Sequence, residues 1–136
     1  MDISILEKIE QILQYRIDSL GYKITSQTRQ LNNLSDTIKQ IYNNRTEAEN
    51  DTKTDSSIIW LSEYKKGINN ILNEYLHQYA KQKNRITGLQ VLKIKEHQKK
   101  DAINKLSHNT KKIHQTLQER REEDDAEELF ITKQYG

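Results

Sequence analysis

The sequence has no proline and no cysteine, and only four glycines occur in its 136 residues. Proline breaks helices and makes up about 5% of an average protein, so its absence favours long uninterrupted helices. Without cysteine there is neither a disulfide framework nor thiolate chemistry. The pattern of a signal peptide is missing, as is the run of about 18 apolar residues that a membrane-spanning helix needs. These absences predict a helical protein of the cytosol that does not insert into a membrane.

Apolar residues are also scarce, at 33% of the chain, whereas charged residues make up 31%. This composition is too polar for an ordinary packed globule. The charges of the two signs are interspersed and nearly balanced, with a net charge of +2. Balanced charge of this kind argues against disorder and favours solvated helix faces.

The apolar residues between positions 3 and 48 recur at alternating steps of three and four. They fit positions a and d of one heptad grid: Ile3, Leu6, Leu13, Ile17, Leu20, Ile24, Leu31, Leu34, Ile38, Ile41 and Ala48. Only Glu10, Gln27 and Arg45 interrupt the series. A heptad repeat held this long predicts a coiled-coil helix from about residue 3 to 48, roughly 70 Å in length. Its narrow apolar stripe requires a partner helix.

A second helix is expected from about residue 57 to 130. Asn, Asp, Thr and Ser crowd the stretch before it, which predicts a loop over about residues 50–56. The second helix follows a heptad grid of its own, with these residues at positions a and d: Leu61, Tyr64, Ile68, Ile71, Tyr75, Leu89, Leu92, Ile103, Leu106, Ile113 and Leu117. Three polar residues interrupt the grid: Gln78, Gln82 and Arg85. Three apolar residues beside it indicate a local drift of the stripe: Leu72, Tyr79 and Ile86.

The two grids match when the chain folds back at the loop, because residues whose numbers sum to about 109 then face each other. The expected apolar pairs are Ile41–Ile68, Ile38–Ile71, Leu34–Tyr75, Leu20–Leu89, Ile17–Leu92 and Leu6–Ile103. The interruptions also find partners: Gln27–Gln82, Glu10–Lys99 and Arg45–Tyr64, the last as a cation–π contact. This agreement favours a monomeric hairpin over a parallel homodimer. We therefore predict an all-α fold, with two long helices in an antiparallel coiled-coil hairpin that forms a single domain over residues 1–136.

The second helix is longer than the first, so residues beyond about 107 form an overhang without a partner. The overhang keeps exposed apolar positions, namely Ile113, Leu117, Leu129 and Phe130. Its charges fall into two blocks, first basic and then acidic: Lys111, Lys112, Arg120 and Arg121, followed by Glu122, Glu123, Asp124, Asp125, Glu127 and Glu128. An isolated helix of about 20 residues is marginal in water, so this segment is expected to fray or to fold on binding.

The sequence holds no pattern of catalytic or metal-binding chemistry. No two of the four histidines stand at the i, i+3 or i, i+4 spacing of a helical metal pair. The acidic run 122–128 lacks the glycine turn and the alternating ligands of a calcium loop. A narrow coiled coil offers no pocket in which a catalytic triad could exclude water. We predict that the protein is not an enzyme and has no catalytic, cofactor-binding or metal-binding residues.

Two other features could bind a partner. The most apolar run of the chain opens the second helix, where Ile59, Trp60 and Tyr64 either seal the end of the hairpin or form a docking patch. From Lys81 to Arg121 the basic residues far outnumber the acidic ones, and such a helix can follow phosphates. The chain has no recognisable groove-reading motif, however, and we expect no nucleic acid among its partners.

The combination of a two-helix hairpin, a polar mid-chain loop, no cysteine, and the segment RREEDDAEELF after a basic stretch resembles the type III secretion central-stalk family. This is the YscO/FliJ/InvI family, and the chain looks most like its EscO-type members. The resemblance implies a fold similar to the coiled coil of a rotary ATPase gamma subunit. It implies a non-enzymatic stalk that enters a hexameric secretion ATPase, promotes its assembly and activity, and contacts the export gate. Secretion chaperones are further partners that the family suggests. The implied location is cytoplasmic, at the periphery of the inner-membrane secretion apparatus.

Under this resemblance the overhang would contact the ATPase ring. The expected ATPase-binding residues are Lys111, Lys112, Arg120, Arg121, Glu122 and Glu123, braced by Ile3 and Leu6 at the neighbouring N-terminal end. Three alternatives stay open at this point. The overhang could be a solubilising tail, the whole chain could be a generic scaffolding coiled coil or homodimer, and the basic helix could bind nucleic acid.

Overall fold

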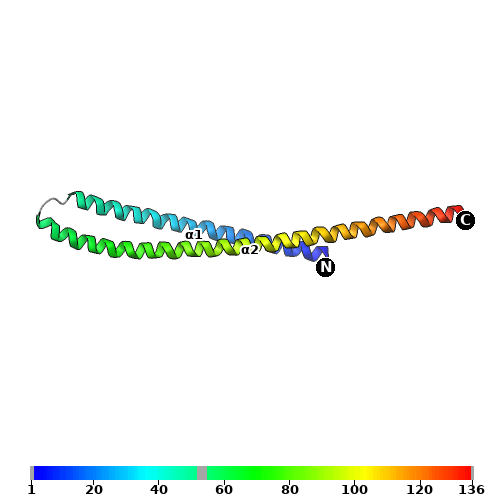
Figure 1. Cartoon of the computed structure of the whole chain (residues 1–136), viewed down its shortest axis with the longest axis horizontal. Coiled ribbons are helices and arrows are strands. Elements are labelled where there is room, and N and C mark those ends of the chain that lie inside the picture. Colours follow the sequence, from blue (N-terminus) through cyan, green and yellow to red (C-terminus); the bar gives the residue numbers. More distant parts are fainter. Residues whose placement is uncertain (1, 52–54, 136) are drawn as a thin grey trace. The chain divides into compact units, whose positions relative to one another are not determined.

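The computed structural model describes residues 2–51 and 55–135, and these residues form two long α-helices (Figure 1). Helix α1 spans Ile3–Asp51 and helix α2 spans Asp55–Tyr135. The predicted all-α fold with two long antiparallel helices is confirmed. Both helices continue a few residues beyond their predicted bounds into the expected loop, of which residues 52–54 lie outside the described part. Neither helix has a stretch, within the described residues, that is long and apolar enough to cross a membrane.

Asp2 starts helix α1 as its N-terminal cap. The Asp2 carboxylate oxygen Oδ1 accepts a hydrogen bond from the backbone N–H of Ser4 at 3.2 Å. The Asp2 carbonyl oxygen accepts from the N–H groups of Ile5 and Leu6 at 3.1 and 3.2 Å. These bonds satisfy backbone donors that a helix end otherwise leaves without partners.

The chain divides into two compact units, each built from a segment of α1 and a segment of α2. The first, here called the loop unit, comprises residues Ser19–Lys93. The second, here called the terminal unit, comprises Met1–Asp18 and Ile94–Gly136. Within the loop unit the two helical segments run side by side in opposite directions (Figure 1, cyan and green).

The core of the loop unit is a cluster of Ile38, Ile68 and Leu72. The partly buried side chains that pack against this cluster are Ile41, Tyr64, Tyr75 and Tyr79. Ile41 and Ile68 therefore share one cluster, as the predicted register requires. Burial of these aliphatic and aromatic side chains is the main favourable contribution to pairing of the helices.

Helix α2 turns a different face to the core than the sequence predicts. Ile71 was expected to face Ile38, but Ile71 is 46% exposed and the neighbouring Leu72 is 3% exposed. Leu92 is likewise exposed, whereas Ile86, off the predicted grid, is buried. Leu72, Tyr79 and Ile86, which the sequence placed beside the grid, are thus residues of α2 that contact α1. The predicted contacts Ile68 and Tyr75 are kept, and only the alternate contact positions of the grid move one residue further along α2.

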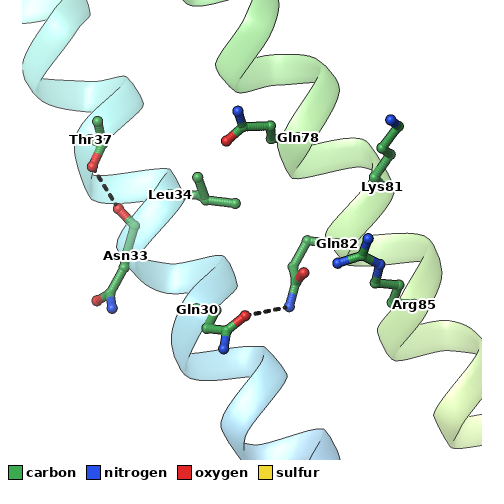
Figure 2. A pocket seen from close by; sticks show the side chains of 8 residues that line it. All are labelled: Gln30, Asn33, Leu34, Thr37, Gln78, Lys81, Gln82 and Arg85. Carbon is green, nitrogen blue, oxygen red and sulfur yellow. Dashed lines mark hydrogen bonds between the residues drawn. The ribbon is translucent and has the colours of Figure 1, made fainter.

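The polar layer expected between Gln27 and Gln82 is present. Gln82 is 5% exposed, and its Nε2 donates to the backbone carbonyl of Gln27 at 3.1 Å and to the Gln27 side-chain oxygen. The same nitrogen also reaches Oε1 of Gln30 at 3.5 Å (Figure 2). Because a buried amide needs these partners, the layer favours one register of the two helices over slipped alternatives.

Arg45 does not form the predicted cation–π contact with Tyr64. Its guanidinium carbon instead lies 5.3 Å from the ring centroid of Tyr42, on the preceding turn of α1. The guanidinium also donates to Oδ1 of Asn69 at 3.1 Å and lies 3.9 Å from Glu49. Tyr64 instead packs against the apolar side chains of the core cluster.

The terminal unit buries apolar residues of α1 beneath a largely polar stripe of α2. Leu6, Leu13 and Ile17 are buried. The half-buried or buried positions that α2 supplies within this unit are Glu96, Lys100, Ile103, Ser107 and Thr110. The predicted core residue Leu106 is exposed, and the next residue, Ser107, is buried in its place.

Long polar side chains bridge the helices of the terminal unit. Glu10 was expected to face Lys99, but it faces Asn104. With the Asn104 amide oriented so that its nitrogen points to the carboxylate, that nitrogen donates to both carboxylate oxygens at 2.8 and 3.1 Å. Lys99 instead lies 3.2 Å from Glu96 on its own helix. The ammonium of Lys100 donates to the side-chain oxygen of Gln14. Polar contacts thus take the place of the apolar seam that was predicted here.

Candidate partner-binding site

The last part of α2 is a bare helical segment, here called the arm and defined as residues 111–133. Figure 1 draws this part of α2 in orange and red. Every side chain from Lys111 to Lys133 is exposed. The paired region ends slightly later than the predicted residue 107, because Ser107 is buried and Thr110 is half-buried. The predicted overhang is therefore present but begins about one turn further along the helix.

The charges of the arm are free for a partner, with one exception. Lys111 lies 3.8 Å from Glu7 of α1, with both side chains about half exposed. Among the described residues, no ion pair involves the other predicted contacts: Lys112, Arg120, Arg121, Glu122 and Glu123. An exposed pair such as Lys111–Glu7 contributes little to stability. It nevertheless marks where α1 stops covering α2.

The apolar residues of the arm are exposed as predicted. They are Ile113, Leu117, Leu129 and Phe130, and each has about half or more of its side chain open to solvent. Ile131 belongs with them, at 55% exposure, although the sequence analysis missed it. Its position directly after Leu129 and Phe130 in the sequence could have identified it as part of this apolar set. A shallow depression on this helix is lined by Ala126, Glu127, Phe130 and Ile131.

The N-terminal residues Ile3 and Leu6 are less available than predicted. Leu6 is the one fully buried large side chain of the described residues, with 0% exposure, because it sits at a core position of the α1 grid. Ile3 is half-buried. Leu6 can therefore hold α1 against α2, but it cannot contact a partner while the terminal unit stays folded.

The three residues predicted as a second patch lie together in the loop unit. The rings of Trp60 and Tyr64 are stacked, with centroids 5.1 Å apart and planes 8° apart. Ile59 is 75% exposed and Trp60 is also more than half exposed. Tyr64 joins these residues to the core cluster. The ring of Trp60 thus packs on Tyr64, which contacts the core cluster, while more than half of Trp60 is exposed to solvent.

Comparison of the chain with family models, curated proteins and solved structures gives no match.

The arm is the larger of the two candidate sites and the more selective. A helix that presents basic and then acidic side chains, beside exposed leucine, isoleucine and phenylalanine, can bind a protein surface through apolar burial and complementary charge. Its charges would steer a partner and set its orientation. Within the described residues, no group of three or more histidine, cysteine or acidic side chains is arranged to hold a metal ion.

Proposed function

We propose that this protein is the central stalk of a type III secretion ATPase complex. In this proposal the arm enters the hexameric ATPase ring, promotes assembly and activity of the ring, and links it to the export gate. The stalk has no catalytic role of its own and binds neither cofactors nor nucleic acid. It acts in the cytoplasm, at the periphery of the inner-membrane secretion apparatus, where secretion chaperones are further candidate partners.

The observation that carries the proposal is the arm. An antiparallel hairpin in which one helix outruns the other supplies a narrow single helix with free charges, which suits a channel lined by rings of subunits. The free side chains comprise Arg120 and Arg121 in the basic block and Glu122 and Glu123 in the acidic block. Several such charges together can orient a helix in a channel, although each exposed pair alone is weak.

The test is stimulation of the purified cognate ATPase at low ionic strength. Three forms of the protein are compared: the full chain, a chain that ends at residue 119, and the double variant Arg120→Glu/Arg121→Glu. We expect the full chain to stimulate ATP hydrolysis and both altered forms to lose most of that stimulation. Raised salt should weaken the full chain's effect in the same way, because salt screens exposed charges.

The matched control is Lys39→Glu/Lys83→Glu, which makes the same change in net charge on exposed lysines of the loop unit. This control should stimulate as the full chain does. Full stimulation by the shortened chain would refute the arm as the ring contact. The exposed surface of Ile59 and Trp60 would then be the next surface to alter.

A scaffolding coiled coil is the second candidate function, and one observation favours it. Ile5, Ile12 and Tyr15 are exposed on the face of α1 that points away from the core positions of its heptads. Such a face can pack against another helix. Co-purification separates the two candidates, since a stalk copurifies with the hexameric ATPase and a scaffold of this kind does not.

A further inference from the structure

A polar groove runs between the two helices of the loop unit (Figure 2). It has a volume of about 470 Å³. Helix α1 contributes Gln30, Asn33 and Thr37 to its walls, and α2 contributes Gln78, Lys81 and Arg85. Within the described part of the chain, neither Lys81 nor Arg85 takes part in an ion pair or a hydrogen bond. The groove thus holds two unpaired cations beside several amides.

The basic character of the groove extends along the loop unit. Residues 19–35 of α1 and 75–93 of α2 contain no aspartate and no glutamate. The same stretches contain six lysines and arginines: Lys23, Arg29, Lys81, Lys83, Arg85 and Lys93. In a chain whose net charge is only +2, this band is strongly one-sided. It favours an acidic partner, because a cluster of like charges raises the local potential.

The groove changes character at Arg85. This residue also lines a second, neighbouring groove of about 440 Å³, whose other walls include Lys23, Gly88, Leu89 and Leu92. A side-chain carbon placed on Gly88 would find nothing within 4 Å, so the backbone there is open to an approaching group. Leu92 is 49% exposed. A ligand that fits both grooves therefore carries acidic groups followed by apolar ones.

We infer that these joined grooves bind the acidic end of the arm from a second copy of this chain. The arm carries six acidic residues between 122 and 128, followed by the exposed Leu129, Phe130 and Ile131. Neither Glu123 nor Glu127 forms an ion pair among the described residues. The occupant thus supplies the charge that the groove lacks and the apolar surface that Gly88 and Leu92 accept. This inference does not rest on the proposed secretion role.

The spacings on the two surfaces match residue by residue. On α2 the groove presents Lys81, Arg85, Gly88 and Leu89 in order along the helix. The arm presents Glu123, Glu127, Phe130 and Ile131 in the same order. Each groove residue and its counterpart on the arm are 42 residues apart, which is six heptads. The four residues of each set therefore have the same spacing and lie at the same relative angles around their helix. An arm lying parallel to α2 brings all four pairs together at once.

Such a contact is head-to-tail, because the groove and the arm are different surfaces. Each copy keeps its own hairpin, and its free arm or free groove can bind a further copy. Association should therefore rise with protein concentration and fall with salt. Exposed charges provide orientation more than affinity, so the complexes are expected to dissociate on dilution.

The test measures the mass of the full-length chain in solution by light scattering and sedimentation velocity. At low salt the average mass is expected to rise with concentration above that of the monomer, and to return to the monomer value at about 0.5 M salt. The variants Lys81→Glu/Arg85→Glu and Glu123→Lys/Glu127→Lys should each stay monomeric. Mixing the two variants should restore association, as should combining all four substitutions in one chain.

The control Lys39→Glu/Lys66→Glu should associate as the unaltered chain does, because both lysines are exposed and neither lines the grooves or belongs to the basic band. Circular dichroism should show equal helix content for every variant, since all substituted side chains are exposed. A chain that stays monomeric at every concentration overturns the inference. So does association that survives either double variant, or a fourfold variant that stays monomeric.

Discussion

Among single residues, Glu96 is the most costly polar side chain in the contact between the helices. It occupies a contact position of the terminal unit, and its side chain is 15% exposed. Its Oε2 is buried without a hydrogen-bond partner, and the guanidinium of Arg16 lies 4.0 Å from it. Its other oxygen pairs with Lys99 at 3.2 Å. The carboxylate has therefore lost much of its hydration, and its contacts with protein groups compensate for only part of that loss.

Replacing Glu96 by leucine is expected to stabilise the protein. Leucine suits a coiled-coil contact position, and removing a poorly compensated carboxylate from such a site is often neutral or favourable. We expect the free energy of unfolding in urea to rise by about 1 kcal/mol. Glu119→Leu, on the exposed arm, is the control and should change it by less than about 0.5 kcal/mol. A clear loss of stability in the Glu96 variant would mean that its ion pairs contribute more than the desolvation costs.

Comparison of the two helices shows how far a heptad pattern determines the packing. In α1 nearly every contact position carries isoleucine, leucine or alanine, so only one heptad grid fits the sequence. The positions that this grid predicts are buried or half-buried along the helix. In α2 two stripes compete, because Ile71 and Leu72 are adjacent and both apolar. The stripe through Leu72, Tyr75, Tyr79, Gln82 and Ile86 has a single polar interruption, whereas the predicted one also contained Gln78 and Arg85. Counting interruptions would have identified the correct face in the loop unit.

In the terminal unit the sequence offers no such signal. The contact stripe of α2 includes Glu96, Lys100 and Ser107, while the apolar Leu106 is exposed. Helix geometry rotates the contact face by a fixed angle per residue, so a face chosen by strong apolar packing persists where the side chains are polar. Lysine tolerates such a position because its stem packs while its ammonium reaches a polar partner. The exposure of the arm was predictable, since it required only that α2 outrun α1.

The choice of face on α2 can be tested by a pair of alanine substitutions. Leu72→Ala removes buried methyl groups from the core cluster and should lower the free energy of unfolding by about 2–4 kcal/mol. Ile71→Ala alters a half-exposed side chain and should cost less than about 1 kcal/mol. Urea unfolding followed by circular dichroism measures both. Equal costs, or a larger cost at position 71, would restore the face that the sequence grid predicted.

Across the whole molecule, stability is expected to follow the composition of the contacts. The loop unit has an apolar cluster around Ile38, Ile68 and Leu72. The terminal unit combines buried Leu6, Leu13 and Ile17 with a polar stripe, and the arm buries nothing. Apart from the exposed Lys111–Glu7 pair, the arm is held by helical hydrogen bonds, and an isolated helix of about 20 residues is marginal in water.

Hydrogen exchange followed by mass spectrometry should resolve these three levels. Amides are protected most where opening a helix exposes apolar surface, so the slowest exchange is expected around residues 38–41 and 64–86. The terminal unit should exchange at an intermediate rate, because its polar stripe contributes less free energy per residue. The arm, residues 111–133, should exchange fastest. If the arm were as well protected as residues 64–86 in dilute, high-salt solution, some intramolecular contact would have to cover it. If its protection instead rose with protein concentration and vanished in salt, the arm would be ordered by binding to another copy, with Lys81 and Arg85 as the residues to alter first.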